Sequence, residues 1–312
     1  MTLHVVDLVD PPAGPLPLGV LVATGDPDAA DAEYWLQRAT FTLVEKAHAD
    51  RRTVCVPSVA AAVAELRERI ERCPRAASVC DDVLRAVDVT APAFAGVITE
   101  SLAYSTLQSG PEFARWLAER GPATMPVSPD PVQAERDGDV LRVRLNRPRR
   151  HNAFSTDARA ALLDALEVAR LDSSVTRTVL TGNGESFCSG GDLAEFGTFT
   201  DPATAHLART RYSPALVLDE ITTRLGPSCR AEVHGQVLGS GLEMAAFCGY
   251  VTCRPGATLG LPELALGLIP GAGGTVSITR RIGRWRTAYL VLSGQTVDPG
   301  TALDWGLVDE VG

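Results

Sequence analysis

The sequence predicts an α/β protein in which a layered α/β core follows a mainly helical N-terminal region. After residue 137, short strand-like apolar runs alternate with amphipathic helical segments, which is typical of an α/β layered domain. Before residue 121, apolar residues recur at three- and four-residue spacing, which is typical of helices. Residues 122–136 contain four prolines and little periodicity, so we expect a linker there.

The N-terminal region, residues 1–121, contains several segments with helical spacing. They are residues 32–50, 58–73, 77–87, 95–108 and 110–120. One short apolar run, LGVLVATG at residues 18–25, is instead consistent with a buried strand. We therefore expect helices to dominate this region.

The core, residues 137–312, begins with DVLRVRLN at 139–146, whose alternation of apolar and polar residues predicts a strand. Ser155 is expected to cap the amphipathic helix that follows it. Two further strands and one long helix are predicted, at TRTVLTG (176–182), CRAEVHG (229–235) and about residues 204–224.

The composition limits the function classes. The chain has 312 residues, a hydrophobic content of 45% and a formal net charge of −9, which argues against a general nucleic-acid binder. No run of about 18 apolar residues predicts a membrane span. The start, MTLHVVDLVDPP, lacks a basic segment followed by a long apolar stretch, so we expect no signal peptide. Because Lys46 is the only lysine, arginines or backbone N–H groups would have to bind any phosphate.

The cysteines predict free thiols. There are seven of them, scattered without a CxxC motif, and only five histidines accompany them. We therefore expect buried free thiols in a reducing cytoplasm, and no zinc or other metal site. The cysteines are Cys55, Cys73, Cys80, Cys188, Cys229, Cys248 and Cys253.

Two strand-to-helix turns rich in small residues have the same design. They are ESFCSGGDLAEF at 185–196 and VHGQVLGSGLEMAA at 233–246. Small residues let backbone N–H groups point outward at a helix N-terminus, where the helix dipole favours negative charge. Either turn alone is also an ordinary connection, but two such N–H groups from separate turns would make an oxyanion hole.

Two glutamates stand in apolar surroundings. Glu243 lies at the head of an apolar helix, and Glu263 lies in LGLPELALGLIPGAGGT at 259–275. A carboxylate that faces a core is costly unless it is paired or used. Glu243 is therefore either a helix cap or a working acid or base. Glu263 is a solvated turn residue, an N-cap partner or a second such group.

Three common motifs are absent or incomplete. PGAGGT lacks the GxxxxGK[ST] pattern of a phosphate loop, and no GxGxxG follows a strand. A serine nucleophile at Ser240 is disfavoured, because Leu238 and Leu242 stand where a nucleophile elbow needs glycine.

Four segments together resemble the crotonase, or enoyl-CoA hydratase/isomerase, superfamily over about residues 137–311. They are RPRRHNAFS (147–155), VLTGNGESFCSGGDL (179–193), VHGQVLGSGLEMAAFCGY (233–250) and LGLPELALGLIPGAGGTVSITRRIG (259–283). The resemblance implies a ββα-superhelix core that binds an acyl-CoA thioester. Coenzyme A would then enter as part of the substrate, with no separate cofactor.

The resemblance also implies roles for particular residues. The backbone N–H groups of Gly191 and Ser240 match the oxyanion-hole positions, which would stabilise a thioester enolate. Glu243 and Glu263 match the two catalytic glutamates of the family's hydratases, so their joint presence favours hydration or dehydration.

Coenzyme A would lie against a second set of residues that the resemblance implies. Residues from Gly191 through Asp192 and Leu193 to Ala194 match the segment that lines the pantetheine and adenine path. Arg149 and Arg150 are expected neighbours of the CoA phosphates.

Other reactions on the same scaffold remain open: isomerisation, thioester hydrolysis, decarboxylation, and oxygenation of an aryl-acetyl-CoA. A non-catalytic CoA-binding assembly protein is a further alternative. The family leads us to expect a homo-oligomer, either a trimer or a hexamer.

The N-terminal region departs from the family pattern. The family's core is normally followed by C-terminal helices that cover the acyl pocket, whereas this chain ends at WGLVDEVG. Residues 95–120 resemble those helices, so we expect them to pack over the mouth of the Gly191 and Ser240 site, as in a circularly permuted crotonase. An unrelated helical domain followed by a truncated tail is the alternative.

Overall fold

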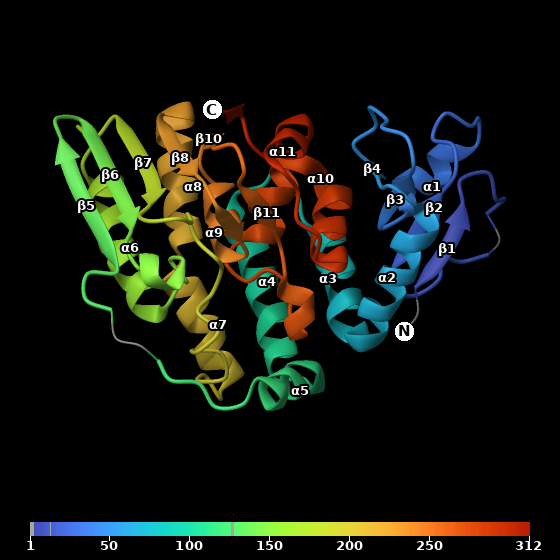
Figure 1. The fold of residues 1–312 in the computed structure, drawn as a ribbon, viewed down its shortest axis with the longest axis horizontal. Coiled ribbons are helices and arrows are strands. Elements are labelled where there is room, and N and C mark those ends of the chain that lie inside the picture. The colour runs from blue at the N-terminus through green and yellow to red at the C-terminus, as the bar shows by residue number, and fades with distance from the viewer. Residues whose placement is uncertain (1–2, 13, 126–127) are drawn as a thin grey trace.

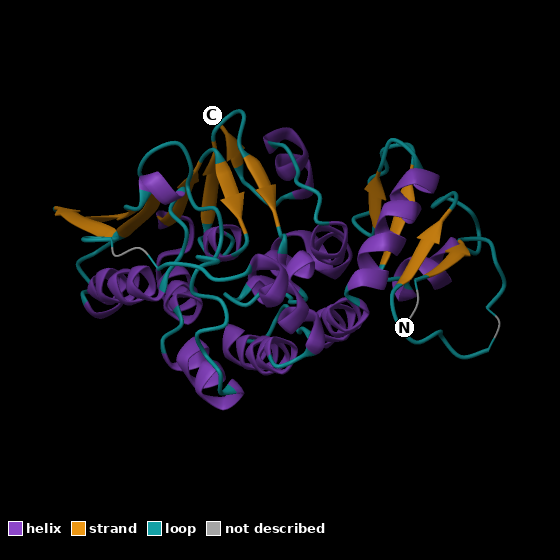
Figure 2. Cartoon of the chain, turned by 60° about the horizontal axis from the view of Figure 1, so that its bottom comes forward, coloured by secondary structure: helices purple, strands orange, loops and turns teal. Residues whose placement is uncertain are grey.

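The computed structural model describes residues 3–12, 14–125 and 128–312 of the chain. A small sheet lies at one end of the molecule and a larger sheet at the other, with helices packed between them (Figure 1). In Figure 2 the strands of the larger sheet lie along one side, and most helices lie beneath them.

Within the region predicted to be mainly helical, residues 1–121, the part up to Cys55 contains a sheet that the prediction did not include. It forms a parallel four-stranded sheet in the order β1-β2-β3-β4 (Figure 1). The elements are β1 (His4–Asp7), β2 (Leu21–Thr24), α1 (Ala32–Arg38), β3 (Phe41–Val44) and β4 (Thr53–Cys55).

The structure confirms the strand predicted within residues 18–25, as β2, but the predicted helix over 32–50 is wrong. The helix ends at Arg38, and all four residues of β3 are buried. Aromatic and β-branched residues fit a strand that is buried on both faces. Periodicity alone does not separate such a short apolar run from a helix.

The helices predicted in the rest of the N-terminal region are present. They are α2 (Val59–Arg72), α3 (Pro74–Ala86), α4 (Ala93–Gln108) and α5 (Pro111–Arg120). The Ser58 hydroxyl caps α2 by accepting a hydrogen bond from the Ala61 N–H at 3.4 Å. Pro74 and Pro111 occupy the first turns of α3 and α5, where a missing N–H costs nothing.

The predicted linker is shorter than residues 122–136. Strand β5 (Val132–Asp137) already starts within it and pairs antiparallel with β6 (Val140–Leu145). Gly138, at φ 58°, makes the tight turn between these strands. Residues 126–127 of the predicted linker lie outside the described residues.

The larger sheet has six strands in the order β12-β10-β8-β7-β6-β5. Apart from β5, its strands pair in parallel, as expected of an α/β layer. The three strands predicted from the sequence are confirmed as β6, β7 (Arg177–Gly182) and β8 (Cys229–Val233). The others are β10 (Tyr250–Cys253) and β12 (Glu310–Val311), and β9 (Gln236–Leu238) pairs separately with β11 (Thr258–Gly260).

The single long helix expected over about 204–224 is in fact two helices, α7 (Pro202–Arg211) and α8 (Pro214–Leu225). Pro214 lacks an N–H and disfavours helical geometry at the residue before it. The chain therefore restarts with Ser213 as the N-cap of α8. The remaining helices of the core are α6 (Thr156–Leu171, capped by Ser155 as predicted), α9 (Ser240–Ala245), α10 (Gly274–Ser293) and α11 (Pro299–Trp305).

One hydrophobic core joins the two regions of the chain. Helix α10 packs against α2, α3, α4 and β3, and the Tyr289 ring of α10 meets the edge of Phe41 with ring centroids 5.6 Å apart. The N-terminal helices are therefore part of the same folded unit as the core, and they lie next to the cavity described below.

Membrane spans and metal clusters were not found among the described residues. Within them, no helix combines the length and apolar character needed to cross a bilayer. No group of three or more His, Cys, Asp or Glu side chains there is placed to hold a metal ion. All seven cysteines are free thiols in the described structure; six are buried and Cys55 is exposed.

Candidate active site

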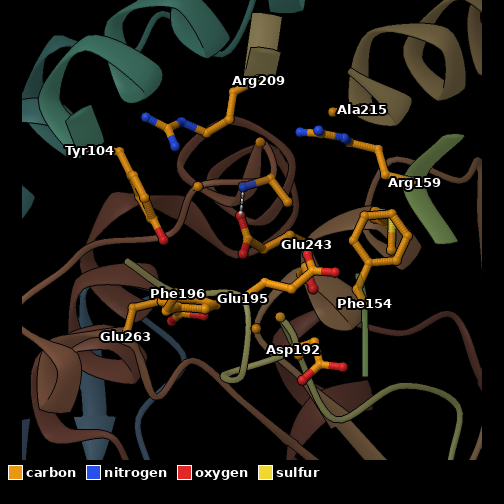
Figure 3. Close-up of a pocket in the computed structure, with 18 of the residues that line it drawn as sticks. Tyr104, Phe154, Arg159, Asp192, Glu195, Phe196, Arg209, Ala215, Glu243 and Glu263 are labelled. Carbon is orange, nitrogen blue, oxygen red and sulfur yellow. Dashed lines mark hydrogen bonds between the residues drawn. The ribbon is translucent and has the colours of Figure 1, made fainter. Parts of the chain in front are cut away.

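A cavity of about 330 Å³ lies between the two regions of the chain. Its walls come from α4, the start of α6, the turn after Ser189, helices α7 and α8, the β9–α9 turn and the segment before α10. Figure 3 shows that acidic, basic and aromatic side chains converge on it. Segments far apart in the sequence therefore build one site.

Gly191 and Ser240 lie in neighbouring turns at this cavity. The turns are held together because the Leu238 N–H donates to the Cys188 carbonyl at 2.9 Å and the Cys188 N–H donates to the Gln236 carbonyl at 3.0 Å. Within the described part of the chain, no group accepts a hydrogen bond from the backbone N–H of Gly191 or Ser240. Two such donors at one cavity could bind one carbonyl oxygen.

Glu243 lies on α9 and is only 2% exposed. Its Oε2 accepts hydrogen bonds from the Ala272 N–H at 2.7 Å and the Gly274 N–H at 2.8 Å. Burial raises the pKa of Glu243 to about 7, although these backbone donors oppose the shift. Because the carboxylate lines the cavity, it can exchange a proton with a ligand there near neutral pH.

Glu263 lies in the short 3-10 helix Glu263–Leu266 and is buried. Its Oε2 has no hydrogen-bond partner among the described groups. Burial, followed by the charge of Glu243, raises the pKa of Glu263 well above its usual range. Its carboxyl group is packed against Gly239, where an added Cβ would lie 2.6 Å from Oε1. Burial therefore favours the protonated form of Glu263 beside the Ser240 turn.

A third carboxyl group, Glu100 of α4, was not predicted as a site residue. It is 1% exposed and lines the same cavity. It accepts hydrogen bonds from the Gly273 N–H at 2.7 Å, the Thr275 N–H at 2.9 Å and the Thr275 hydroxyl at 2.7 Å. Burial and then the charge of Glu243 raise the pKa of Glu100 to about 8. Its position as the only charged residue of α4 was the one sequence signal that could have pointed to it.

Asp192 forms ion pairs with two arginines beside the Gly191 turn. It is buried and accepts hydrogen bonds from Arg147 at 2.8 Å and Arg150 at 3.0 Å. Burial opposes ionisation, but the two guanidinium groups and the Ala194 N–H still lower the pKa of Asp192 below its ordinary value. Arg147, which sequence reasoning missed, is itself buried. The pair fixes the segment that carries Gly191.

The structure brings together most of the predicted site residues, but not all of them. Those that line the cavity are Gly191, Asp192, Leu193, Ser240, Glu243 and Glu263. Ala194, Arg149 and Arg150 are not part of its lining. Arg149 is exposed, and Arg150 forms an ion pair with Asp192.

Known proteins resemble the second part of this chain. A profile of the family described as Enoyl-CoA hydratase/isomerase matches residues 135–312. The chain is 36% identical over 172 residues to the 2,3-dehydroadipyl-CoA hydratase of Escherichia coli (strain K12), covering 55% of this chain and 65% of that relative. It is 32% identical over 182 residues to a probable enoyl-CoA hydratase of Mycobacterium tuberculosis, covering 58% and 68%. The chain thus spans just under two thirds of the length of the first relative.

Solved structures give the same result. A structure titled enoyl-CoA hydratase/carnithine racemase from Magnetospirillum magneticum matches with a TM-score of 0.52 and 28% identity, covering 59% of this chain and 68% of the other. An enoyl-CoA hydratase/isomerase from Mycobacterium abscessus, described as putative in its own title, matches with a TM-score of 0.51 and 30% identity, covering 58% and 70%. The resemblance predicted from the four segments is confirmed, since the family profile covers more than half of the chain: the protein belongs to the enoyl-CoA hydratase/isomerase, or crotonase, family.

Proposed function

We propose that the protein is an enoyl-CoA hydratase-type enzyme, which adds water across the α,β double bond of an acyl-CoA thioester or removes it in the reverse direction. One observation carries this proposal: Glu243 and Glu263 share a cavity with the unpaired N–H groups of Gly191 and Ser240. Hydration needs a base for water, an acid for the α-carbon and donors for the enolate oxygen.

The different environments of the glutamates favour different roles. Glu243, with a pKa raised to about 7 by burial, is ionised in part near neutral pH and takes a proton from water. The oxygen of that water forms a bond to the β-carbon, and the electron pair of the double bond moves onto the thioester as an enolate. Glu263, held protonated, gives its proton to the α-carbon. A proton then passes from Glu243 to Glu263 and restores the starting state.

The N-terminal helices would supply the cover of the acyl pocket in this proposal. What supports it is that Val97, Ser101 and Tyr104 of α4 line the cavity. Helix α5 also packs on the loop after Gly191, where the Trp116 and Phe196 rings lie 5.8 Å apart. These contacts favour a permuted crotonase over an unrelated helical domain. The trimer or hexamer expected from the family stays a prediction. Sedimentation velocity would measure the oligomeric state in solution.

Incubation with crotonyl-CoA and with a longer enoyl-CoA tests the reaction type. We expect the absorbance of the conjugated thioester to fall without release of free thiol. Glu243→Gln and Glu263→Gln should each lower kcat by about two to four powers of ten while CoA-thioester binding persists. Glu185→Gln, which changes an exposed carboxylate away from the cavity lining, is the matched control.

Other outcomes would replace the proposal. Free thiol released at the full rate indicates a thioester hydrolase, and a shifted double bond without added water indicates an isomerase. Unchanged activity in both glutamine variants would show that the cavity is not the site of the reaction.

A further inference from the structure

Two arginines line the same cavity and have no part in the proposed hydration chemistry. Arg159 lies on α6 and Arg209 on α7. Figure 3 shows their guanidinium groups beyond the Glu243 carboxylate, on the side of the cavity away from Asp192. The two are also close enough for the charge of Arg159 to act on Arg209. The cavity therefore holds two neighbouring cations.

Arg209 has only neutral partners. Its guanidinium donates to the Gln108 side-chain oxygen at 3.3 Å and to the Ser101 hydroxyl at 3.4 Å, and also donates to the Ser105 hydroxyl. It lies over the Tyr104 ring, 4.4 Å from the centroid. All these groups belong to α4, so this wall of the cavity orients the Arg209 charge without neutralising it.

Arg159 has even less support. Among the described residues, no group forms a hydrogen bond or an ion pair with its guanidinium. Arg147 differs from Arg159 in this respect, because the buried Arg147 guanidinium forms an ion pair with Asp192 at 2.8 Å. Burial lowers the pKa of both Arg159 and Arg209. Both guanidinium groups are thus partly shielded from water, and neither has a counter-ion in contact with it.

Two carboxylates act on these arginines through space but form no ion pair with them in the described structure. Glu195 acts on Arg159 through space, but its carboxylate accepts hydrogen bonds from the Thr156 N–H at 2.7 Å and the Thr156 hydroxyl at 2.9 Å. Glu100 acts on Arg209 through space, but its two oxygens accept hydrogen bonds from Gly273 and Thr275, at the start of α10. A guanidinium keeps its charge in a protein, and both side chains are only half-buried, so the pair can accept an anionic group from outside the chain.

We propose that Arg159 and Arg209 bind an anionic group at the distal end of the acyl chain, so that the preferred substrate is an enoyl-CoA whose acyl group ends in a carboxylate. This rests on the proposed function, since it names the substrate of the same cavity. Planar guanidinium groups match a carboxylate in shape and in hydrogen-bond directions.

The acyl carboxylate is favoured over a CoA phosphate by the depth of the Arg209 contacts. Ser101, Tyr104 and Ser105, against which Arg209 lies, are 2%, 8% and 4% exposed. A phosphate keeps more of its water when it binds at an open rim, whereas a terminal carboxylate is carried inward by the apolar chain before it.

Binding of saturated thioesters tests the proposal without any turnover. The probes are butanoyl-CoA paired with succinyl-CoA, and hexanoyl-CoA paired with hexanedioyl-CoA, measured by calorimetry at a constant salt concentration. We expect the wild-type protein to bind the carboxylate-ended member of at least one pair more tightly. Arg159→Met and Arg209→Met should each weaken that probe by about tenfold to a hundredfold and leave its methyl-ended partner unchanged.

Two variants sharpen the result. Arg211→Met changes an exposed arginine of the same helix, outside the cavity lining, and should leave all four probes unaffected. Arg159→Lys keeps the charge and should restore part of the preference.

Three results would overturn the inference. Equal weakening of both members of a pair would place the arginines on the CoA portion of the ligand. Equal wild-type affinity for both members at every length would show that no anion site exists, even if the variants failed to fold. If both methionine variants still prefer the carboxylate-ended probe, the anion site lies elsewhere in the protein. Because the probes are not turned over, a failure of the hydratase assay leaves this test intact.

Discussion

Glu100 and Glu243 bind alternate backbone N–H groups of one short segment, although they lie on helices from opposite regions of the chain. Glu243 accepts hydrogen bonds from the first and third N–H groups of residues 272–275. Glu100 accepts them from the second and fourth. The segment that opens α10 is thus held between two carboxylates. Because Glu100 of α4 binds the same segment as Glu243, α4 helps to fix the position of the proposed base.

The raised pKa values of Glu243 and Glu263 predict a bell-shaped pH dependence of kcat/KM. The rate rises as Glu243 ionises around pH 7, because only the carboxylate takes a proton from water. It falls again at higher pH, where Glu263 loses the proton that it must donate. Rates for crotonyl-CoA across the pH range measure this, with protein fluorescence as the control for unfolding. A rate that does not vary between pH 6 and pH 8 would contradict the assignment of Glu243 as the base.

Burial of Glu100 predicts that the protein becomes less stable as the pH rises. Its pKa is 4.5 when unfolded and about 8 when folded, so between these values the folded state binds more protons than the unfolded state. The free energy of unfolding should therefore be highest below about pH 4.5 for this group and fall until about pH 8. Urea unfolding at a series of pH values measures the slope.

Glu100→Gln should remove part of that slope, because glutamine does not titrate. Glu185→Gln, at an exposed position, should leave the slope unchanged. If Glu100→Gln and the wild-type protein show the same slope, Glu100 ionises in the folded state without the penalty that its burial implies.

Gly239 is predicted to be essential for the placement of Glu263. An added Cβ would lie 2.6 Å from Glu263 Oε1, and the residue has φ 48°, which disfavours a side chain. Gly239→Ala should cost about 1–3 kcal/mol of stability and abolish activity. Gly256→Ala is the matched control: it has φ 79°, but its Cβ meets no atom within 4 Å. We expect it to lose stability and keep its kcat, and equal loss of activity in both variants would refute the contact.

The buried ion pair of Arg147 and Asp192 is predicted to hold the Gly191 turn. Asp192→Ala leaves Arg147 buried without its partner, so the free energy of unfolding should fall by about 3–5 kcal/mol. Asp172→Ala breaks an exposed pair with Arg136 and should have little effect. Urea unfolding of both variants tests this, and similar losses would show that burial does not set the strength of the Arg147 pair.

Local features of the site could be predicted from the sequence. Gly239 and Ser240 begin a helix and place Glu243 within its first turn, and this depends on neighbouring residues alone. The cap at Ser155 and the strands at 139–146 and 176–182 were predictable for the same reason.

Other features depend on what surrounds a segment. Residues 41–44 form a strand because they pair with β2 and β4 on either side and all four side chains are buried, although their spacing also suits a helix. The break at Pro214 was visible in the sequence but was outweighed by the apolar periodicity around it.

By itself, the sequence determined the family of the core, the two turns that present Gly191 and Ser240, and the presence of two glutamates in apolar surroundings. Tertiary structure alone brought Glu100 onto the segment before α10, and Arg159 and Arg209 into one cavity. The physical reason is that turns and caps arise from contacts between neighbours in the chain, whereas desolvation and charge pairing depend on residues that are distant in sequence and meet only in the fold.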